Sequence, residues 1–219
     1  MKMVVLAAGL GTRLNPASGG RPKVLVDLGG ETILDRLLSL ASDLRLDPVV
    51  VTRSEHAAWF QAVPAEVLVE ERPVGILTTL YQTRSAIGDE PFVWVGGDMA
   101  FSEHGPLREI VEGHDPDVFA SYAYCRTDHF KAKVRFEPEL TLKITREGRW
   151  ELSLPNFGVH SPRTFSYMAA NPETDFLQTA LAAGETFVLR EYPYPVFEID
   201  TPPDLAAARS YFERCASIS

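Results

Sequence analysis

The sequence predicts an α/β fold with a mostly parallel sheet, and three patterns support this prediction. In the first half of the chain, short apolar runs with the length of buried strands alternate with segments whose apolar residues recur at helical spacing. Such alternation is typical of a parallel sheet covered by helices on both faces. In the second half, shorter runs of partly alternating polarity predict antiparallel strands. We therefore expect a mixed sheet with a small antiparallel insertion.

Local patterns predict each element of the first half. Thr32 is placed to cap a helix with Asp35 three residues on, because apolar residues from Ile33 to Leu44 share one helical face. The strands expected in this half are Met3–Leu6, Val24–Leu28, Pro48–Thr52, Val67–Glu71 and Phe92–Val95. The other helices expected are Ser54–Phe60, capped by Ser54, then Ile76–Ile87 and Pro106–Glu112.

The second half is expected to contain five short strands, two helices, two further strands and a last helix. The strands expected are Val118–Tyr124, Lys133–Phe136, Thr141–Thr145, Arg149–Leu152, Asn156–His160, Thr186–Tyr192 and Val196–Ile199. The helices expected are Pro162–Ala170, Glu173–Ala183 and Asp204–Ala216, the last begun by Pro202 and Pro203.

The composition excludes several classes of protein. Hydrophobic residues make up 45% of the 219 residues, enough for a full core and too many for a disordered chain. The net charge of −9 argues against a nucleic-acid partner, because phosphate backbones select basic surfaces. No apolar run is long enough to span a bilayer, and the apolar start is too short for a signal peptide. We therefore expect a cytoplasmic protein with no membrane partner.

A glycine-rich segment directly after the first strand predicts a phosphate site. Leu6 to Leu14 reads Leu-Ala-Ala-Gly-Leu-Gly-Thr-Arg-Leu, and Pro22-Lys23 follows. Because glycine has no Cβ, backbone N–H groups can approach a phosphate closely. Thr12 adds a hydroxyl, and Arg13 and Lys23 add two cations that can meet a triphosphate. The segment therefore predicts a nucleoside triphosphate site at one edge of the sheet.

Two other glycine motifs are excluded here. The dinucleotide fingerprint requires a third glycine where this chain has Leu14, which disfavours a dinucleotide-binding oxidoreductase. The phosphate loop of ATPases and GTPases requires Ser or Thr after its lysine, whereas Lys23 is followed by Val24.

The same residues resemble the opening of the sugar-phosphate nucleotidylyltransferases, whose pattern is Leu-Ala-Ala-Gly-x-Gly-Thr-Arg-Leu followed by Pro-Lys. The resemblance implies a Rossmann-like three-layer αβα sandwich and a single domain over residues 1–219. Within it, a nucleotide-binding half is expected over about 1–115, an acceptor-binding part over about 116–200 and a C-terminal helix over 201–219.

The implied reaction is Mg²⁺-dependent transfer of NMP from an NTP to a phosphorylated acceptor, with release of pyrophosphate. A sugar 1-phosphate is the favoured acceptor. By resemblance, Arg13 and Lys23 are the catalytic cations. The nucleotide-binding residues implied in the first segment are Leu6, Ala7, Ala8, Gly9, Gly11, Thr12, Arg13 and Lys23.

Two aspartates are expected at strand ends on the ligand edge of the sheet. Asp98 follows an expected strand and two glycines, and Asp200 follows the last expected strand. From the residues alone, Asp98 could equally be a turn residue, and Asp200 could be a helix N-cap, a role that Thr201 could also fill. The resemblance implies that Asp98 and Asp200 hold Mg²⁺.

The proximity expected for the two aspartates leads to a prediction about stability. Facing carboxylates repel each other unless a cation lies between them, so asparagine at either position is expected to leave the metal-free protein equally or more stable. Glu198 shares a strand face with Asp200 and is either a further ligand or exposed to solvent.

The remaining site residues are assigned by resemblance to two family loops. Glu70, Pro73 and Gly75 correspond to the loop that reads the base. Glu70 can only accept hydrogen bonds at neutral pH, which favours guanine or uracil over cytosine. Asn156 and Gly158 correspond to the acceptor loop, with an ordinary strand turn as the alternative.

Lysines are the candidates for the acceptor phosphate. Lys143 is assigned this role, and Lys133 is a second candidate, with a solvated sheet face as the alternative for each. No arrangement of nucleophile, histidine and acid is visible, and none is required, because a phosphomonoester is already largely dianionic at neutral pH.

The expected partners are an NTP and a phosphorylated small molecule, and a homodimer is left open. Two alternative functions also stay open. One is a cytidylyltransferase that acts on phosphocholine or another phospho-alcohol. The other is a non-catalytic regulatory subunit that binds nucleotide sugars.

Overall fold

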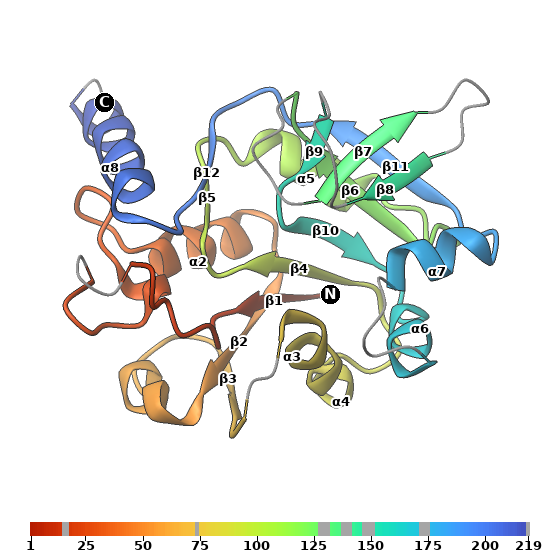
Figure 1. Cartoon of the computed structure of the whole chain (residues 1–219), viewed down its shortest axis with the longest axis horizontal. Coiled ribbons are helices and arrows are strands. Elements are labelled where there is room, and N and C mark those ends of the chain that lie inside the picture. The colour runs from red at the N-terminus through yellow and green to blue at the C-terminus, as the bar shows by residue number, and fades with distance from the viewer. Residues whose placement is uncertain are drawn as a thin grey trace.

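A seven-stranded sheet forms the centre of the molecule (Figure 1). The computed structural model describes residues 1–14, 18–72, 75–126, 132–136, 142–145, 152–170 and 176–217. The sheet has the strand order β11-β6-β10-β4-β1-β2-β3. The strand bounds are β1 Lys2–Leu6, β2 Asp47–Arg53, β3 Glu66–Glu70, β4 Phe92–Gly96, β6 Ala120–Tyr124, β10 Phe157–His160 and β11 Phe187–Glu191. Only β10 is antiparallel to its neighbours in this sheet, which confirms the predicted mostly parallel arrangement.

The parallel strands bring their carboxyl ends to one edge of the sheet. Leu6 at the end of β1 lies opposite Gly96 of β4 and Val51 of β2. Glu191 at the end of β11 lies opposite Tyr124 of β6. The loops after these strands therefore lie along the edge where ligands bind in open α/β sheets.

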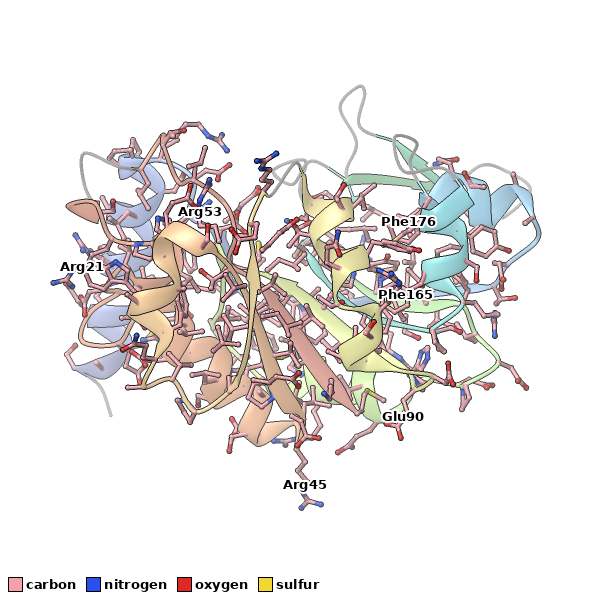
Figure 2. The ribbon with its side chains drawn as sticks, turned by 90° about the horizontal axis from the view of Figure 1, so that it is seen from below. Arg21, Arg45, Arg53, Glu90, Phe165 and Phe176 are labelled. Atoms are coloured by element: carbon pink, nitrogen blue, oxygen red, sulfur yellow. The ribbon has the colours of Figure 1, made fainter. Side chains whose placement is uncertain are left out.

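Helices cover both faces of the sheet, which confirms the three-layer sandwich. On β1, Met3 and Val5 belong to one buried cluster with α2 and α5, and Val4 belongs to a second cluster with α3, α6 and α7. Figure 2 labels Phe165 and Phe176, which come from the helices α6 and α7 of the second cluster. The helix bounds are α2 Ile33–Asp43, α3 Ile76–Gln82, α4 Arg84–Ile87, α5 Gly105–Glu112, α6 Thr164–Ala170, α7 Phe176–Ala182 and α8 Pro202–Ala216.

Two small antiparallel sheets complete the described structure. In one, β5 Met99–Phe101 pairs with β12 Val196–Glu198. In the other, β7 Ala132–Phe136 lies between β8 Leu142–Thr145 and β9 Leu152–Leu154. The second sheet is the predicted antiparallel insertion. The predicted strand Val118–Tyr124 is not part of it, because β6 is buried on both faces within the main sheet.

The predicted strand Val24–Leu28 is wrong. A 3-10 helix spans Lys23–Leu25, where the Leu25 N–H donates to the Pro22 carbonyl oxygen at 2.9 Å. Val24 is buried in the core. Burial of a turn, and not strand pairing, accounts for the apolar residues of this segment.

Two helix predictions also need correction. The predicted helix Ile76–Ile87 is divided at Thr83, whose hydroxyl donates to the Leu80 carbonyl oxygen at 2.7 Å and so competes with the helical ladder. Ser54–Phe60 is a 3-10 helix that begins without the predicted Ser54 cap. The capping box of Thr32 and Asp35, in contrast, forms as predicted at the start of α2.

A buried histidine joins the sheet to α6. His160 has no exposed surface, and its Nε2 accepts a hydrogen bond from Trp94 Nε1 at 2.7 Å. Because an indole N–H can only donate, this nitrogen of His160 carries no proton, and Nδ1 donates to Thr164 Oγ1 at 3.1 Å. Burial, with a smaller effect of His114, lowers the pKa of His160 to about 3.

The free energy of unfolding should therefore fall as the pH drops below 6.5. The unfolded chain takes up the His160 proton near pH 6.5, whereas the folded protein takes it up only near its pKa of about 3. The expected loss between these values is about 1.4 kcal/mol per pH unit from this group. Denaturant unfolding at several pH values checks this. The variant His160→Gln, which cannot titrate, should show a shallower dependence, and equal slopes for both proteins would contradict the assignment.

Candidate active site

The glycine-rich loop lies directly after β1 and folds back on Lys23. The Ala7 N–H donates to the Val51 carbonyl oxygen at 2.8 Å, which anchors the start of the loop to β2. Gly11 has a φ of +61°, and a Cβ on it would lie 3.2 Å from the Lys23 Cβ. Glycine at position 11 therefore allows both the turn and the close approach of the lysine.

This loop lines a cavity of about 270 Å³ together with both predicted aspartates. Its lining residues are Leu6, Ala7, Gly9, Leu10, Gly11, Thr12, Arg13, Lys23, Val24, Gly97, Asp98 and Asp200. The structure thus brings together most of the residues that the sequence analysis assigned to the triphosphate and the metal.

Ion pairs connect the cations and carboxylates of this cavity. Lys23 Nζ lies 2.8 Å from Asp98 Oδ2 and 2.5 Å from Asp200 Oδ1. Arg13 Nη2 lies 2.6 Å from Asp200 Oδ2. The side chains of Lys23 and Asp200 are only 15% and 14% exposed, whereas that of Arg13 is 60% exposed. Lys23 is therefore the cation held between the two aspartates, and Arg13 lies at the mouth of the site.

Asp200 is not the N-cap of α8. The Thr201 hydroxyl accepts the hydrogen bond of the Asp204 N–H, and Asp204 Oδ2 accepts from the N–H groups of Thr201 and Asp200. This capping box provides hydrogen-bond acceptors for backbone N–H groups at the start of the helix without the Asp200 side chain. The Asp200 carboxylate can therefore face the cavity.

Two glycines place Asp98 against the glycine-rich loop. The Gly97 N–H donates to the Leu6 carbonyl oxygen at 3.0 Å, and a Cβ on Gly97 would lie 2.6 Å from that oxygen. A Cβ on Gly96 would lie 2.6 Å from Asp98 Oδ1. A larger residue at Gly97 would therefore collide with the backbone of the loop, and one at Gly96 would collide with the Asp98 carboxylate.

The donor set at this site fits Mg²⁺. Asp98, between β4 and β5, and Asp200, between β12 and α8, offer hard carboxylate oxygens. Mg²⁺ is commonly held by one or two carboxylates together with water and substrate phosphates. Among the described residues, no group of three or more His, Cys, Asp or Glu side chains is placed to hold a metal. Of the two alternatives for Glu198, exposure to solvent does not hold, because the residue is only 8% exposed. Glu198 does not line the cavity of Asp98 and Asp200.

A second cavity, of about 360 Å³, continues from the first toward α3. Leu6, Gly9, Leu10 and Asp98 line both cavities. The further lining residues are Ala8, Arg53, Gly75, Ile76, Thr79 and Gly96. Ala8 and Gly75, which were both assigned to nucleotide binding from the sequence, line this cavity.

Glu70 lies beside this second cavity. Its Oε2 accepts a hydrogen bond from Thr79 Oγ1 at 2.6 Å, and Thr79 itself lines the cavity. Pro73, the other residue assigned to the base-reading loop, lies outside the described residues.

The residues assigned to the acceptor are only partly brought to the site. The Asn156 carbonyl oxygen accepts from the Gly96 N–H at 3.0 Å, which places Asn156 beside the aspartate loop. Gly158 lies within β10, where a Cβ would meet the Tyr122 ring at 2.6 Å, so packing accounts for this glycine. Lys143 lies on β8 in the separate small sheet, as Lys133 does on β7, and their side chains are outside the described part of the structure.

Comparison with known proteins identifies the family of this chain. Residues 3–185 match the family described as the MobA-like NTP transferase domain. The chain belongs to this family.

Individual relatives of this MobA-like domain include sugar-phosphate nucleotidyltransferases. UTP–glucose-1-phosphate uridylyltransferase AglF of Haloferax volcanii is 27% identical over 150 residues, which cover 59% of this chain and 61% of AglF. N-acetylmuramate alpha-1-phosphate uridylyltransferase of Caulobacter vibrioides is 28% identical over 128 residues, which cover 52% of this chain and 53% of that protein. The matched regions thus span less than two thirds of these relatives.

A solved structure shares the fold of this MobA-like domain. The UDP-glucose pyrophosphorylase of Acinetobacter baumannii superposes with a TM-score of 0.83 over 96% of this chain and 92% of that protein, at 16% sequence identity. None of the described helices is long and apolar enough to cross a membrane.

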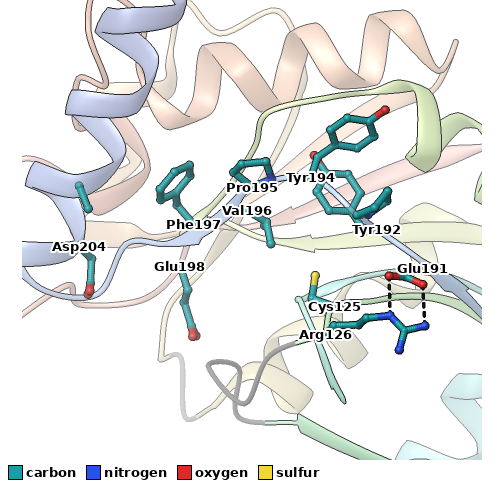
Figure 3. A pocket seen from close by; sticks show the side chains of 12 residues that line it. Cys125, Arg126, Glu191, Tyr192, Tyr194, Pro195, Val196, Phe197, Glu198 and Asp204 are labelled. Atoms are coloured by element: carbon teal, nitrogen blue, oxygen red, sulfur yellow. Dashed lines mark hydrogen bonds and ion pairs between the residues drawn. The ribbon is translucent and has the colours of Figure 1, made fainter. Parts of the chain in front are cut away.

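The MobA-like domain contains a third cavity that the sequence analysis did not find. It has a volume of about 610 Å³ and lies at the carboxyl ends of β6 and β11 (Figure 3). Its lining residues are Cys125, Arg126, Glu191, Tyr192, Pro193, Tyr194, Pro195, Val196, Phe197, Glu198, Asp204 and Ala207. No pattern in the sequence pointed to this cavity, because its lining comes from segments that are far apart in the chain.

Proposed function

We propose that the protein transfers a nucleoside monophosphate from an NTP to a phosphorylated small molecule and releases pyrophosphate. The observation that carries this proposal is the single cavity in which the glycine-rich loop, Arg13, Lys23, Asp98 and Asp200 meet. Family membership and relatives that use UTP support an NTP as the donor. The names of the same relatives support a sugar 1-phosphate as the acceptor.

The residues of the cavity can align two anions and reduce their repulsion. Backbone N–H groups of the loop and the Thr12 hydroxyl can hold phosphate oxygens. Arg13 and Lys23 can stabilise charge on the departing pyrophosphate, and they are close enough to the aspartates to exchange partners when phosphates enter. Asp98 and Asp200 would hold Mg²⁺, which when bound supplies further neutralisation of phosphate charge. No general base is needed for a dianionic acceptor.

A non-catalytic regulatory subunit is a weaker candidate. A protein that only senses a nucleotide sugar does not need a paired set of carboxylates and cations, whereas phosphoryl chemistry depends on positioning and charge neutralisation. The ion pairs of Lys23 with both aspartates therefore favour a catalytic nucleotidyltransferase over a regulatory subunit.

Pyrophosphate release tests the proposal. The protein is incubated with Mg²⁺, each of UTP, GTP, CTP, ATP and dTTP, and a panel of sugar 1-phosphates and phospho-alcohols. We expect release that requires both an NTP and an acceptor. Binding of NTPs without release from any pair of substrates would contradict the proposal and favour a regulatory subunit.

A further inference from the structure

An arginine and a glutamate lie side by side at the ligand edge of the main sheet, and each has a different partner. Arg53, the last residue of β2, lies opposite Glu70, the last residue of β3, in the register of these parallel strands. Both side chains point to the face that α3 covers, because Val51, two residues before Arg53, packs in the buried cluster of α3. Figure 2 shows Arg53 on the side of the molecule opposite to Arg45 and Glu90, which come before β2 and β4.

Glu55 holds Arg53 through one edge of the guanidinium. Arg53 Nε donates to Glu55 Oε2 at 2.8 Å, and Arg53 Nη2 donates to Glu55 Oε1 at 3.2 Å. The Arg53 side chain is 12% exposed and that of Glu55 is 61% exposed, so a surface carboxylate orients a mostly buried cation. This contact lowers the pKa of Glu55 to about 2, which keeps its carboxylate ionised at neutral pH. The other edge of the guanidinium, formed by Nη1 and the second hydrogen of Nη2, has no partner among the contacts of the described residues.

Thr79 of α3 holds Glu70. Its Oγ1 donates to Glu70 Oε2 at 2.6 Å, which fixes the carboxylate and leaves Oε1 without a partner among the described residues. Arg53 and Thr79 both line the second cavity, of about 360 Å³. A guanidinium edge that can donate and a carboxylate oxygen that can accept are therefore brought together beside this cavity.

Two exposed apolar side chains line the same cavity. Leu10 of the glycine-rich loop is 63% exposed, and Ile76 at the start of α3 is 41% exposed. Exposed apolar groups that line a cavity are typical of a binding site, where they can pack on the faces of a flat ring. Leu10 also lines the cavity of Lys23 and Asp98, so a nucleotide whose phosphates lie there has this second cavity beside it for its base.

We propose that Arg53 is a specificity-determining residue that donates to a carbonyl oxygen of the nucleobase, and that Glu55 is the positioning residue that orients it. This role rests on the proposed nucleotidyl transfer and adds a residue to the part of the site that reads the base. The base that fits has a ring N–H next to a carbonyl oxygen, since Glu70 accepts and Arg53 donates. Guanine and uracil both have this edge. Cytosine and adenine have an amino group in place of the carbonyl oxygen and no ring N–H beside it.

Replacement of the carbonyl oxygen by sulfur tests this role. The probes 4-thio-UTP and 6-thio-GTP keep the ring N–H for Glu70, but their sulfur is a poor acceptor for the guanidinium. For the parent protein, we expect kcat/KM for pyrophosphate release to be about tenfold higher for UTP than for 4-thio-UTP, or for GTP than for 6-thio-GTP, as is typical of a hydrogen bond from a charged donor. The pair that shows the difference identifies the base. Arg53→Met should remove the difference by lowering kcat/KM for the carbonyl member alone.

Two further variants complete this experiment. Glu55→Gln changes only an exposed side chain, so it keeps the test available if Arg53→Met does not fold. It should reduce the difference, and it should add nothing to Arg53→Met in the double variant, because it acts only through the arginine. Arg163→Met is the matched control, since Arg163 also donates to a glutamate, Glu185, through Nε and Nη2. Arg163 follows β10, which ends at His160 opposite the first residue of β4, at the other edge of the sheet. It should keep the parent difference.

Calorimetric titration with the same nucleotides separates the role of Arg53 from the proposed reaction. Equal kcat/KM within both pairs for the parent protein, or an equal effect of Arg53→Met on both members of a pair, would overturn the role of Arg53 and leave nucleotidyl transfer standing. An unchanged difference in Glu55→Gln would overturn the role of Glu55. Absence of pyrophosphate release, with tighter binding of UTP or GTP than of its thio analogue that Arg53→Met abolishes, would overturn the transfer and keep the base contact. Absence of release with equal binding within both pairs would overturn both.

Discussion

Asparagine in place of Asp98 or Asp200 should lower the turnover of pyrophosphate release by at least about 10²–10³-fold, the usual cost of removing an electrostatic stabiliser of a reacting phosphate. Both carboxylates line the same cavity as the glycine-rich loop and face the Lys23 ammonium at 2.8 and 2.5 Å. Asparagine keeps the shape of the side chain but removes the charge that would hold Mg²⁺ and orient Lys23. Steady-state kinetics over a range of Mg²⁺ concentrations measures the effect.

The structure changes what we expect for the stability of these asparagine variants without metal. Repulsion between the aspartates led us to expect an equal or higher stability for the asparagine variants, but the structure places Lys23 between the two carboxylates. Asp200→Asn breaks the pairs with both Lys23 and Arg13, so its melting temperature in EDTA should fall by an amount that corresponds to about 1 kcal/mol. Asp89→Asn, at an exposed position, is the matched control. Full activity of either site variant at saturating Mg²⁺ would remove that residue from the metal site.

Lys23→Met should have the second large effect. Turnover should again fall by about 10²–10³-fold, because the ammonium no longer stabilises charge on the pyrophosphate. The free protein should also change its response to metal. In the parent protein Lys23 lies between the two carboxylates where a divalent cation would bind, so Mg²⁺ without nucleotide should raise the melting temperature little. Without the lysine, Mg²⁺ should raise it clearly, since metal bound to the folded state stabilises that state.

The control for this variant is Lys2→Met. Lys2 lies on β1 and pairs with Glu66 of β3, on the other side of β2 and away from the cavity residues. It should keep the parent response to Mg²⁺ and the parent turnover. If Lys23→Met melts at the same temperature with and without Mg²⁺, Lys23 does not compete with the metal, and Asp98 and Asp200 do not bind it in the absence of nucleotide.

The glycine-rich loop and Lys23 could be predicted from the sequence because their chemistry is local. Glycines at fixed spacing after a strand dictate where backbone N–H groups point, and this does not depend on the rest of the fold. Asp98 follows β4 at the edge that the rule for parallel strands predicts. The same expectation was wrong for Asp200, because it follows β12, which pairs antiparallel with β5 in a separate sheet. Only the family resemblance indicated that the two aspartates meet. That Thr201 and not Asp200 caps α8 could not be decided, because both residue types are good caps.

Other features depend on tertiary contacts that no local pattern reveals. The apolar residues of Val24–Leu28 can be buried from a turn as well as from a strand, so their pattern does not distinguish the two. Glycine is needed at position 158 because the Tyr122 ring on the neighbouring strand leaves no room for a Cβ. A single sequence does not show that these two residues are neighbours. The third cavity joins Cys125 and Arg126 to the segment from Glu191 to Glu198, so it exists only once β6 and β11 have paired.

The fate of labelled phosphorus tests the central claim most directly. The protein is incubated with Mg²⁺, an acceptor, and an NTP labelled at either the α- or the γ-phosphorus, and the products are separated. We expect the α-label in a diphospho product that contains the acceptor, and the γ-label in pyrophosphate. Transfer of the γ-label to the acceptor, or its release as inorganic phosphate while the nucleoside diphosphate remains, would contradict nucleotidyl transfer at the site of Lys23, Asp98 and Asp200.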